Sequence, residues 1–344
     1  MTRGAIELDC CQRCGHVYNS AFDPSLLEYG SDYENALHHS PHFQAFAEDL
    51  VDRLRAFATV AEGGLVVDVG CGDGHFLELF YRRSGAPGLG FDPSLPQAKQ
   101  RRAEGAVELT NSDHVGDHRL RQAQLVTCRH VLEHIESPGP FLDDLRGTLP
   151  TGTAVYFEVP NLRAILRDLS VWDLIYEHCG YFSRESLEYL FASHGFEGIE
   201  VEEAFGGQYL GLTAQAGKRG AATADVAELL QEARAFAPRF ADRLQRTRET
   251  FEDASGGRAV LWGAGSKGVA LLNALSIGHE LDCVVDLNPK KHGRFTPGTG
   301  HEVVAPESLR ERSPETVWIT NPLYRVEIRK SLDDLGLTAD IRVL

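Results

Sequence analysis

A glycine-rich turn flanked by two acids is the clearest chemical feature of the sequence. In VVDVGCGDGHF, Asp68 precedes Gly70, Gly72 and Gly74, and a helical pattern follows. Glycines let the backbone adopt positive φ and pass close to a ligand, and the next helix N-terminus presents N–H groups. Asp92 ends the following strand pattern, GLGFD, where a carboxylate can accept both hydroxyls of a ribose. These residues predict a site for a nucleoside-containing cofactor.

The order of residues in this turn separates two classes of cofactor. The string D-V-G-C-G-D-G resembles the S-adenosylmethionine (SAM) signature of class I methyltransferases rather than the G-x-G-x-x-G of nicotinamide sites. The carboxylate of Asp68 suits an ammonium group and would repel a pyrophosphate. The segment LVTCRHVLEHIESP also resembles the strand and helix that line the methionine end of SAM in the same superfamily. The resemblance implies a SAM site made by Asp68, Gly70, Cys71, Gly72, Gly74, Asp92, Arg129 and His130.

A cluster of titratable side chains interrupts an otherwise apolar stretch further on. WDLIYEHCGYFSRESLEYLF contains Tyr176, Glu177, His178 and Tyr181. Buried titratable groups cost several kcal/mol unless they are paired or used, so the cluster is a candidate reaction centre. The alternative for His178 is a polar residue that caps a turn, and Ser183 has the type and place of the N-cap of the next helix.

Several motifs together resemble one family, the sugar C-methyltransferases with a Cys-rich N-terminus and a second α/β domain. The motifs are FEVPN, YEHCGYFS, GGQYLGL, LWGAGSKG, VVDLNPKKHG, PGTG and NPLYRVEI, and they cover nearly the whole chain. The family acts on nucleotide-linked keto-sugars. The resemblance therefore implies removal of a proton beside a carbonyl and transfer of the SAM methyl group to the resulting enolate.

The same resemblance implies residue roles. The family's base is the His of its Glu-His pair, which falls on His178, and Glu177 could fix its tautomer. Tyr176 and Tyr181 offer hydroxyls for the enolate oxygen, and Tyr33 is the nearest match to a Tyr that the family uses near the substrate. Family members carry a further His where this chain has Tyr176, which leaves the substrate and the methylated position open.

Three other functions stay open on the sequence. A SAM enzyme could methylate an O or N atom of another metabolite. A second glycine turn, with Gly263, Gly265, Gly268 and the distal Asp286, fits a nicotinamide fingerprint and hence an NAD(P)-dependent oxidoreductase. Its unit spans only about 88 residues, however, enough for one mononucleotide-binding half, so we expect it to bind no NAD. A non-enzymatic binding module is the least favoured reading, because a scaffold needs neither glycine turn.

Metal binding is suggested twice and weakly. Cys11 and Cys14, beside Cys10, supply half of a structural zinc site, whereas zinc requires four ligands and the family has two CxxC pairs. We expect no firmly bound zinc, although His16 could complete a site. The four-residue spacing between His130 and a second histidine is compatible with a metal site. Two histidines without a third ligand nearby are, however, more often structural.

Alternating strand and helix patterns predict an α/β fold with four parts. We expect an N-terminal Cys-containing segment and docking helix over 1–60, a central Rossmann-like SAM-methyltransferase domain over 61–216 and a helical connector over 217–256. A smaller Rossmann-like α/β domain should occupy 257–344, and Pro238 should kink or break the connector helix.

Composition excludes some partners. The chain has 34 basic and 50 acidic residues, a net charge of −16, with no basic stripe for nucleic acid. No stretch approaches the roughly 20 apolar residues of a membrane span, and no signal peptide is visible, so we expect a cytoplasmic protein with a small-molecule substrate. Neither the oligomeric state nor the methyl acceptor follows from the sequence.

Overall fold

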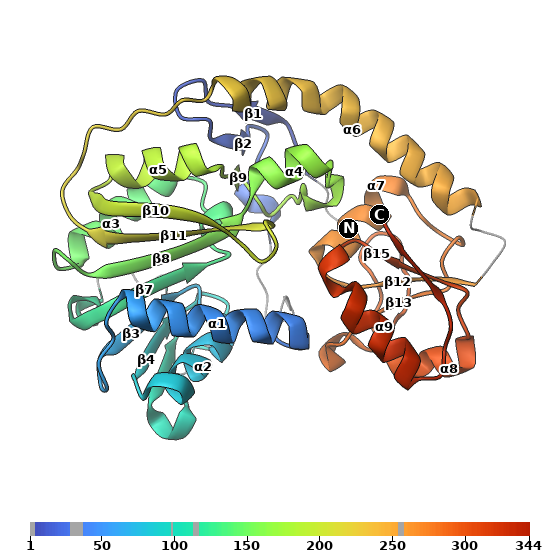
Figure 1. The fold of residues 1–344 in the computed structure, drawn as a ribbon, viewed down its shortest axis with the longest axis horizontal. Coiled ribbons are helices and arrows are strands. Elements are labelled where there is room, and N and C mark those ends of the chain that lie inside the picture. Colours follow the sequence, from blue (N-terminus) through green and yellow to red (C-terminus); the bar gives the residue numbers. More distant parts are fainter. Residues whose placement is uncertain (1–3, 28–36, 98, 113–116, 254–257) are drawn as a thin grey trace.

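The computed structural model describes residues 4–27, 37–97, 99–112, 117–253 and 258–344, and it contains three β-sheets (Figure 1). The alternating sequence pattern is thereby confirmed as a mixed α/β fold. Within the described residues, no helix is both long and apolar enough to cross a membrane. All seven cysteines are thiols.

The central sheet has eight strands in the order β10-β11-β8-β7-β3-β4-β6-β5. Five of them are parallel: β3 (Leu65–Val69), β4 (Gly88–Phe91), β6 (Val107–Thr110), β7 (Ala123–Arg129) and β8 (Ala154–Pro160). Three pair antiparallel to their neighbours: β5 (Gln100–Arg102), β10 (Phe196–Ala204) and β11 (Tyr209–Ala216). The carboxyl ends of the five parallel strands meet at one edge, where such sheets place their ligands.

Helices cover both faces of this sheet (Figure 1). One face packs against α1 (Pro41–Phe57) and α2 (His75–Ser84), and the other against α3 (Pro138–Thr148) and α5 (Arg184–Ser193). The short α4 (Leu162–Asp168) follows β8. Ser183 is the N-cap of α5, as its sequence position predicts, because its side chain accepts the Ser186 N–H.

A small antiparallel sheet ties the N-terminal segment to the candidate reaction centre. It contains β1 (Leu8–Cys10), β2 (Val17–Asn19) and β9 (Gly180–Tyr181), and Val17 pairs with Tyr181. Because β9 begins two residues after His178, the Cys-containing segment holds the chain directly beyond that histidine.

The third sheet is entirely parallel, in the order β14-β13-β12-β15-β16. Its strands are β12 (Ala259–Trp262), β13 (Cys283–Val285), β14 (Val303–Val304), β15 (Thr316–Ile319) and β16 (Asp340–Val343). Its helices are α7 (Ser266–Leu275), α8 (Leu309–Arg312) and α9 (Arg325–Asp334). Short 3₁₀ turns join elements throughout: η1 (Pro24–Leu26), η2 (Ala103–Gly105), η3 (His118–Gln122), η4 (Leu132–His134), η5 (Val171–Asp173), η6 (Pro289–Lys291), η7 (Pro306–Ser308) and η8 (Pro322–Tyr324).

The long helix α6 (Ala227–Asp253) links the two α/β units (Figure 1). Of the two outcomes predicted for Pro238, the break is wrong, because the helix continues through the proline, and the kink stays a prediction. Tertiary packing explains the difference: Phe236 and Phe240 lie on either side of the proline and pack into the core with α4. Such burial offsets the roughly 3 kcal/mol cost of an internal proline.

Candidate active site

The first glycine turn lies at the carboxyl edge of the central sheet, between β3 and α2. Gly70 has φ 73° and a Cβ there would lie 2.1 Å from Val131 Cγ2, so only glycine fits. A Cβ at Gly72 would meet nothing within 4 Å, although its φ is also positive. The loop therefore packs tightly below Gly70 and leaves open space over Gly72, as a ligand that crosses the loop requires.

Asp92 faces this loop from the end of β4. Its Oδ2 accepts the Gly72 N–H at 2.9 Å, and its Oδ1 accepts the Ser94 N–H at 2.8 Å. The remaining lone pairs of the carboxylate are available to ribose hydroxyls. The Cys71 sulfur lies between the loop and β4: the thiol donates to Gly72 O at 3.6 Å, and a Cβ at Gly90 would lie 2.5 Å from the sulfur.

Asp68 is buried at the base of the loop. The Thr127 hydroxyl donates to its Oδ1 at 2.6 Å. Burial raises the pKa of Asp68 to about 6, although the Thr127 hydrogen bond opposes the rise. A neighbouring positive charge would stabilise the ionised form, which is what the ammonium group of SAM offers.

A buried charge network follows β7. Glu158 Oε1 lies 3.1 Å from Arg129 Nη2 and 3.1 Å from His130 Nε2, and Tyr156 donates to Glu158 Oε2 at 2.8 Å. Burial lowers the pKa of His130, but hydrogen bonds to Glu133 and Glu158 outweigh it and raise the pKa to about 9. Two cations thus face Glu158, which keeps its carboxylate ionised despite complete burial.

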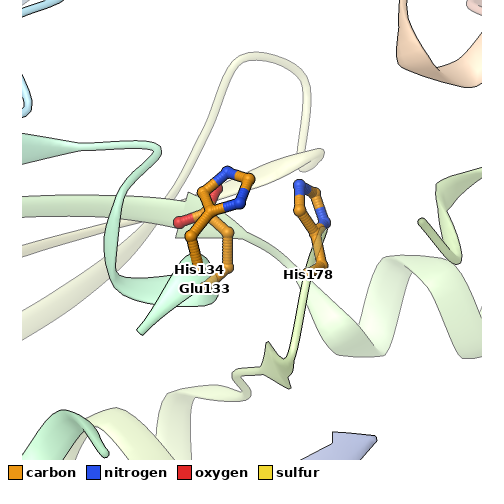
Figure 2. A group of neighbouring side chains, drawn as sticks. All are labelled: Glu133, His134 and His178. Atoms are coloured by element: carbon orange, nitrogen blue, oxygen red, sulfur yellow. The ribbon is translucent and has the colours of Figure 1, made fainter. Parts of the chain in front are cut away.

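Beyond this network, His178 and His134 lie side by side (Figure 2). Their ring centroids are 4.9 Å apart, and the carboxylate of Glu133 lies close by, with donor and acceptor atoms of the three side chains within 4.8 Å of one another. Burial lowers the pKa of His178 to about 3, while the charge of Glu133 opposes that shift. The imidazole is therefore neutral and can accept a proton, with a carboxylate beside it to stabilise the cation.

The backbone of the loop before His178 is held rigidly. His178 N–H donates to Ile175 O at 3.0 Å, and the buried Tyr181 hydroxyl donates to the same oxygen at 3.2 Å. His134 Nδ1 lies 2.9 Å from Glu177 O. Tyr181 therefore supports the loop through its hydroxyl, and Glu177 supports it through its backbone carbonyl.

Other predicted residues lie elsewhere or outside the described residues. The Tyr176 hydroxyl bonds to the N-terminal segment, where it accepts the Asp23 N–H at 2.9 Å. Tyr33 lies outside the described residues. Sequence reasoning missed Glu133 and Glu158. Glu158, in FEVP, carried no spacing signal, because only the folded sheet brings it to His130. Glu133, in VLEHIE, lies three residues after His130, a local spacing that could pair the two side chains but gives no sign of His178.

The second glycine turn reaches the same region from the C-terminal unit. Lys267, at the start of α7, pairs with Asp173 Oδ1 at 2.7 Å and donates to Gln208 Oε1 at 3.3 Å. Asn321, after β15, exchanges hydrogen bonds with Gln208 at 2.7 and 2.9 Å. Asp173 ends η5, five residues before His178, so the C-terminal unit contacts the reaction-centre loop through its own glycine turn.

The cysteine segment forms a tight turn. Gly15 N–H donates to Cys11 O, and Cys11 N–H donates to His16 O, both at 2.9 Å. The His16 ring packs against Phe182 at a tilt of 35°, with ring centroids 4.6 Å apart, and burial lowers the pKa of His16 to about 4. The His16 ring thus packs in the interior. Among the described residues, the group of side chains that could together ligate a metal does not include the cysteines.

Comparison with known proteins agrees with this geometry. Residues 38–201 match the family model of a methyltransferase domain, and residues 208–337 match that of the C-methyltransferase C-terminal domain, which together define a SAM-dependent methyltransferase. The C-methyltransferase NovU of Streptomyces niveus is 30% identical over 94% of this chain and 81% of its own length. The chain belongs to this family of SAM-dependent C-methyltransferases.

Other matches cover smaller shares of the chain. The ubiquinone biosynthesis O-methyltransferase of Salmonella newport is 31% identical over 30% of this chain and 48% of its own length. A solved SAM-dependent methyltransferase from Archaeoglobus fulgidus is 19% identical, covers 51% of this chain and 100% of its own, and has a TM-score of 0.38. The magnesium protoporphyrin IX methyltransferase of Synechocystis PCC 6803, with bound SAH, is 18% identical over 51% of this chain and 83% of its own, with a TM-score of 0.38.

The residues at the sheet edge fit SAM. The open space over Gly72, the Asp92 carboxylate and the buried Asp68 match the needs of a loop-crossing ligand with a ribose and an ammonium group. No feature of the described loop would exclude it.

Proposed function

We propose that the enzyme C-methylates a small polar keto substrate, foremost a nucleotide-linked keto-sugar, through an enolate. The observation that carries this proposal is the group of His178, His134 and Glu133, half-buried to buried, at the same sheet edge as the SAM loop. A base of this kind would also serve a hydroxyl acceptor, so the choice of a carbon acceptor rests on the match to the C-methyltransferase family.

In the proposed reaction His178 accepts the proton from the carbon beside the carbonyl. The C–H electron pair becomes the enolate, and the carboxylate of Glu133 stabilises the imidazolium that forms. SAM, when bound, supplies an electrophilic methyl group whose carbon–sulfur bond breaks as the new carbon–carbon bond forms. Asp68, Asp92 and the glycine turn position the cofactor, so that the chain chiefly contributes proton transfer and orientation.

Replacement of the base tests the proposal. His178→Ala should lower turnover of a keto-sugar by about 10³-fold, the scale of general base catalysis, and should leave SAM affinity largely intact. His194→Ala is a matched control, because His194 is similarly placed against a carboxylate, at 2.8 Å from Asp143, but lies at the end of α5. Product formation can be followed by mass spectrometry as the gain of one methyl group alongside S-adenosylhomocysteine.

Proton exchange isolates the first step. With S-adenosylhomocysteine in place of SAM in D₂O, the native enzyme should exchange the substrate proton beside the carbonyl for deuterium, and His178→Ala should not. Full activity of His178→Ala, or unchanged exchange, would remove His178 from the role of base. Methylation of a substrate that has no exchangeable carbon-bound proton would instead indicate an O- or N-acceptor.

A further inference from the structure

Three metal-ligating side chains converge beside the SAM loop. Among the described residues, the group in which at least three His, Cys, Asp or Glu side chains could hold one metal ion is Glu133, His134 and His178. Their ligand atoms lie within 4.8 Å of one another, and Figure 2 shows the two imidazole rings next to each other with the carboxylate near His134. The histidines come from separate segments, η4 and the loop before β9, so the fold creates this convergence.

Two of the ligand atoms lack a partner. Glu133 Oε2 and His178 Nδ1 are both shielded from solvent and make no hydrogen bond. An unsatisfied buried polar atom costs about 1–3 kcal/mol, and the cost is higher for a charged group. A cation between the two atoms would satisfy both, which is a second reason, independent of spacing, to expect a ligand here.

The donor set selects the class of ion. Imidazole nitrogens favour Zn²⁺, Co²⁺, Ni²⁺ and Cu²⁺, whereas Mg²⁺ and Ca²⁺ favour oxygen ligands. Zinc bonds of about 2.0–2.2 Å place tetrahedral donor atoms about 3.3 Å apart. The present group is somewhat wider, with atoms within 4.8 Å, so rotation of an imidazole would complete ligation. Three protein ligands leave a fourth position for water.

We propose that Glu133, His134 and His178 bind one divalent transition-metal ion of the Zn²⁺ class, and that the bound ion inhibits methyl transfer. Binding follows from the convergence and the unpartnered atoms. Inhibition rests additionally on the proposed function, because a metal-bound His178 has lost a lone pair and cannot take the substrate proton.

Binding is tested without reference to activity. Co²⁺ is titrated into the full-length native protein, and its visible d–d absorption is recorded. A saturable band at one equivalent is expected, and it should be lost in Glu133→Gln and in His134→Ala. SAM affinity of each variant verifies that it is folded, and the nearly isosteric Glu133→Gln guards against a fold defect in His134→Ala. A band that both substitutions leave unchanged, or no saturable band, overturns the site.

Two control variants test whether other metal-ligating residues hold the Co²⁺ ion. Cys11→Ser should leave the d–d band of the proposed site in place, since the cysteine turn is remote in sequence and contributes thiolates rather than imidazoles. His194→Ala, which removes a histidine paired with Asp143, should also leave it unchanged. Loss of the band in either control would assign the ion elsewhere and overturn the proposal.

Inhibition of methyl transfer by the bound ion is tested in a second experiment. Zn²⁺ should suppress turnover of the native enzyme at least tenfold, EDTA should restore it, and the residual turnover of Glu133→Gln should be insensitive to Zn²⁺. Co²⁺ binding to the three residues without inhibition would overturn the inhibitory part and count against His178 as the base. Absence of Co²⁺ binding, with turnover still lost in His178→Ala, would overturn the metal site and leave the proposed function standing.

Discussion

We expect the ionisation of Asp68 to set how tightly the cofactor is held. Burial raises its pKa to about 6, so the carboxylate is ionised at neutral pH and becomes protonated as the pH falls below that value. Protonation removes the charge that pairs with the ammonium group of SAM. At pH 5, about one-tenth of the free enzyme carries the ionised form, so SAM affinity should fall roughly tenfold from its value at pH 7.5.

Calorimetric titration of SAM across this pH range measures the effect. Asp68→Asn should bind SAM more weakly at pH 7.5 and should show little of the pH dependence, because it cannot titrate. If the SAM affinity of the native enzyme is the same at pH 5 and pH 7.5, Asp68 does not pair with the ammonium group of SAM.

The sequence could predict residues whose role is local, and it missed those that depend on distant contacts. The turn from Asp68 to Gly74 carries its own geometry in its glycines, and the N-cap role of Ser183 depends on the next three residues. Glu133 offered no comparable signal, because its partner His178 lies on another segment and only the fold brings them together. Hydrophobic periodicity predicts that a residue is buried, but it cannot predict which charged side chain lies next to that residue.

At the scale of elements, the loop between η5 and β9 is held from three sides. β9 pairs with β2 of the N-terminal segment, Val171 and Trp172 pack into the core of the C-terminal unit, and Lys267 of α7 pairs with Asp173. The strands and helices themselves were largely predictable from hydrophobic alternation. The three-sided support was not, because strand β9 is only two residues long and its partner precedes it by more than 160 positions.

Loss of the Lys267–Asp173 pair should therefore displace the His178 loop. Lys267→Met leaves the nearly buried Asp173 without its cation, and we expect kcat to fall about 10–100-fold, with SAM affinity unchanged, because small misplacements of reacting groups have effects of this size. Lys267→Arg should recover part of the activity. Lys291→Met, which removes the cation beside Asp286 in the same unit, is the control. Native kcat in Lys267→Met would show that the pair does not position the loop.

At the scale of the whole molecule, two glycine turns share one geometry and differ in use. In each, the acid at the end of the second strand accepts a loop N–H: Asp92 from Gly72 at 2.9 Å, and Asp286 from Ala264 at 2.8 Å. Asp286 also pairs with Lys291 at 3.4 Å, whereas Asp92 accepts backbone N–H groups from Gly72 and Ser94. The Asp286–Lys291 pair adds a structural difference to the difference between the two sequence motifs.

We therefore expect the C-terminal unit to bind no nicotinamide dinucleotide. Its five parallel strands, counted along the chain from β12, lie in the order 3-2-1-4-5, so the sheet extends beyond the single mononucleotide-binding half expected from its length. The expectation therefore rests on Asp286, the acid that would hold a ribose, which is already paired within the chain. A fluorescence titration with NADH and NADPH should show no saturation in the low-micromolar range. Saturable binding that is lost in Asp286→Ala would identify a working nucleotide site and revive the oxidoreductase alternative.

The atom that receives the methyl group tests the central claim most directly. Native enzyme is incubated with methyl-¹³C SAM and a panel of nucleotide-linked keto-sugars, and carbon NMR locates the label in each product. The account predicts a new carbon–carbon bond at the position beside the carbonyl. A label found only on oxygen or nitrogen, in these or any other acceptors, would contradict the enolate mechanism and the role of His178 as its base.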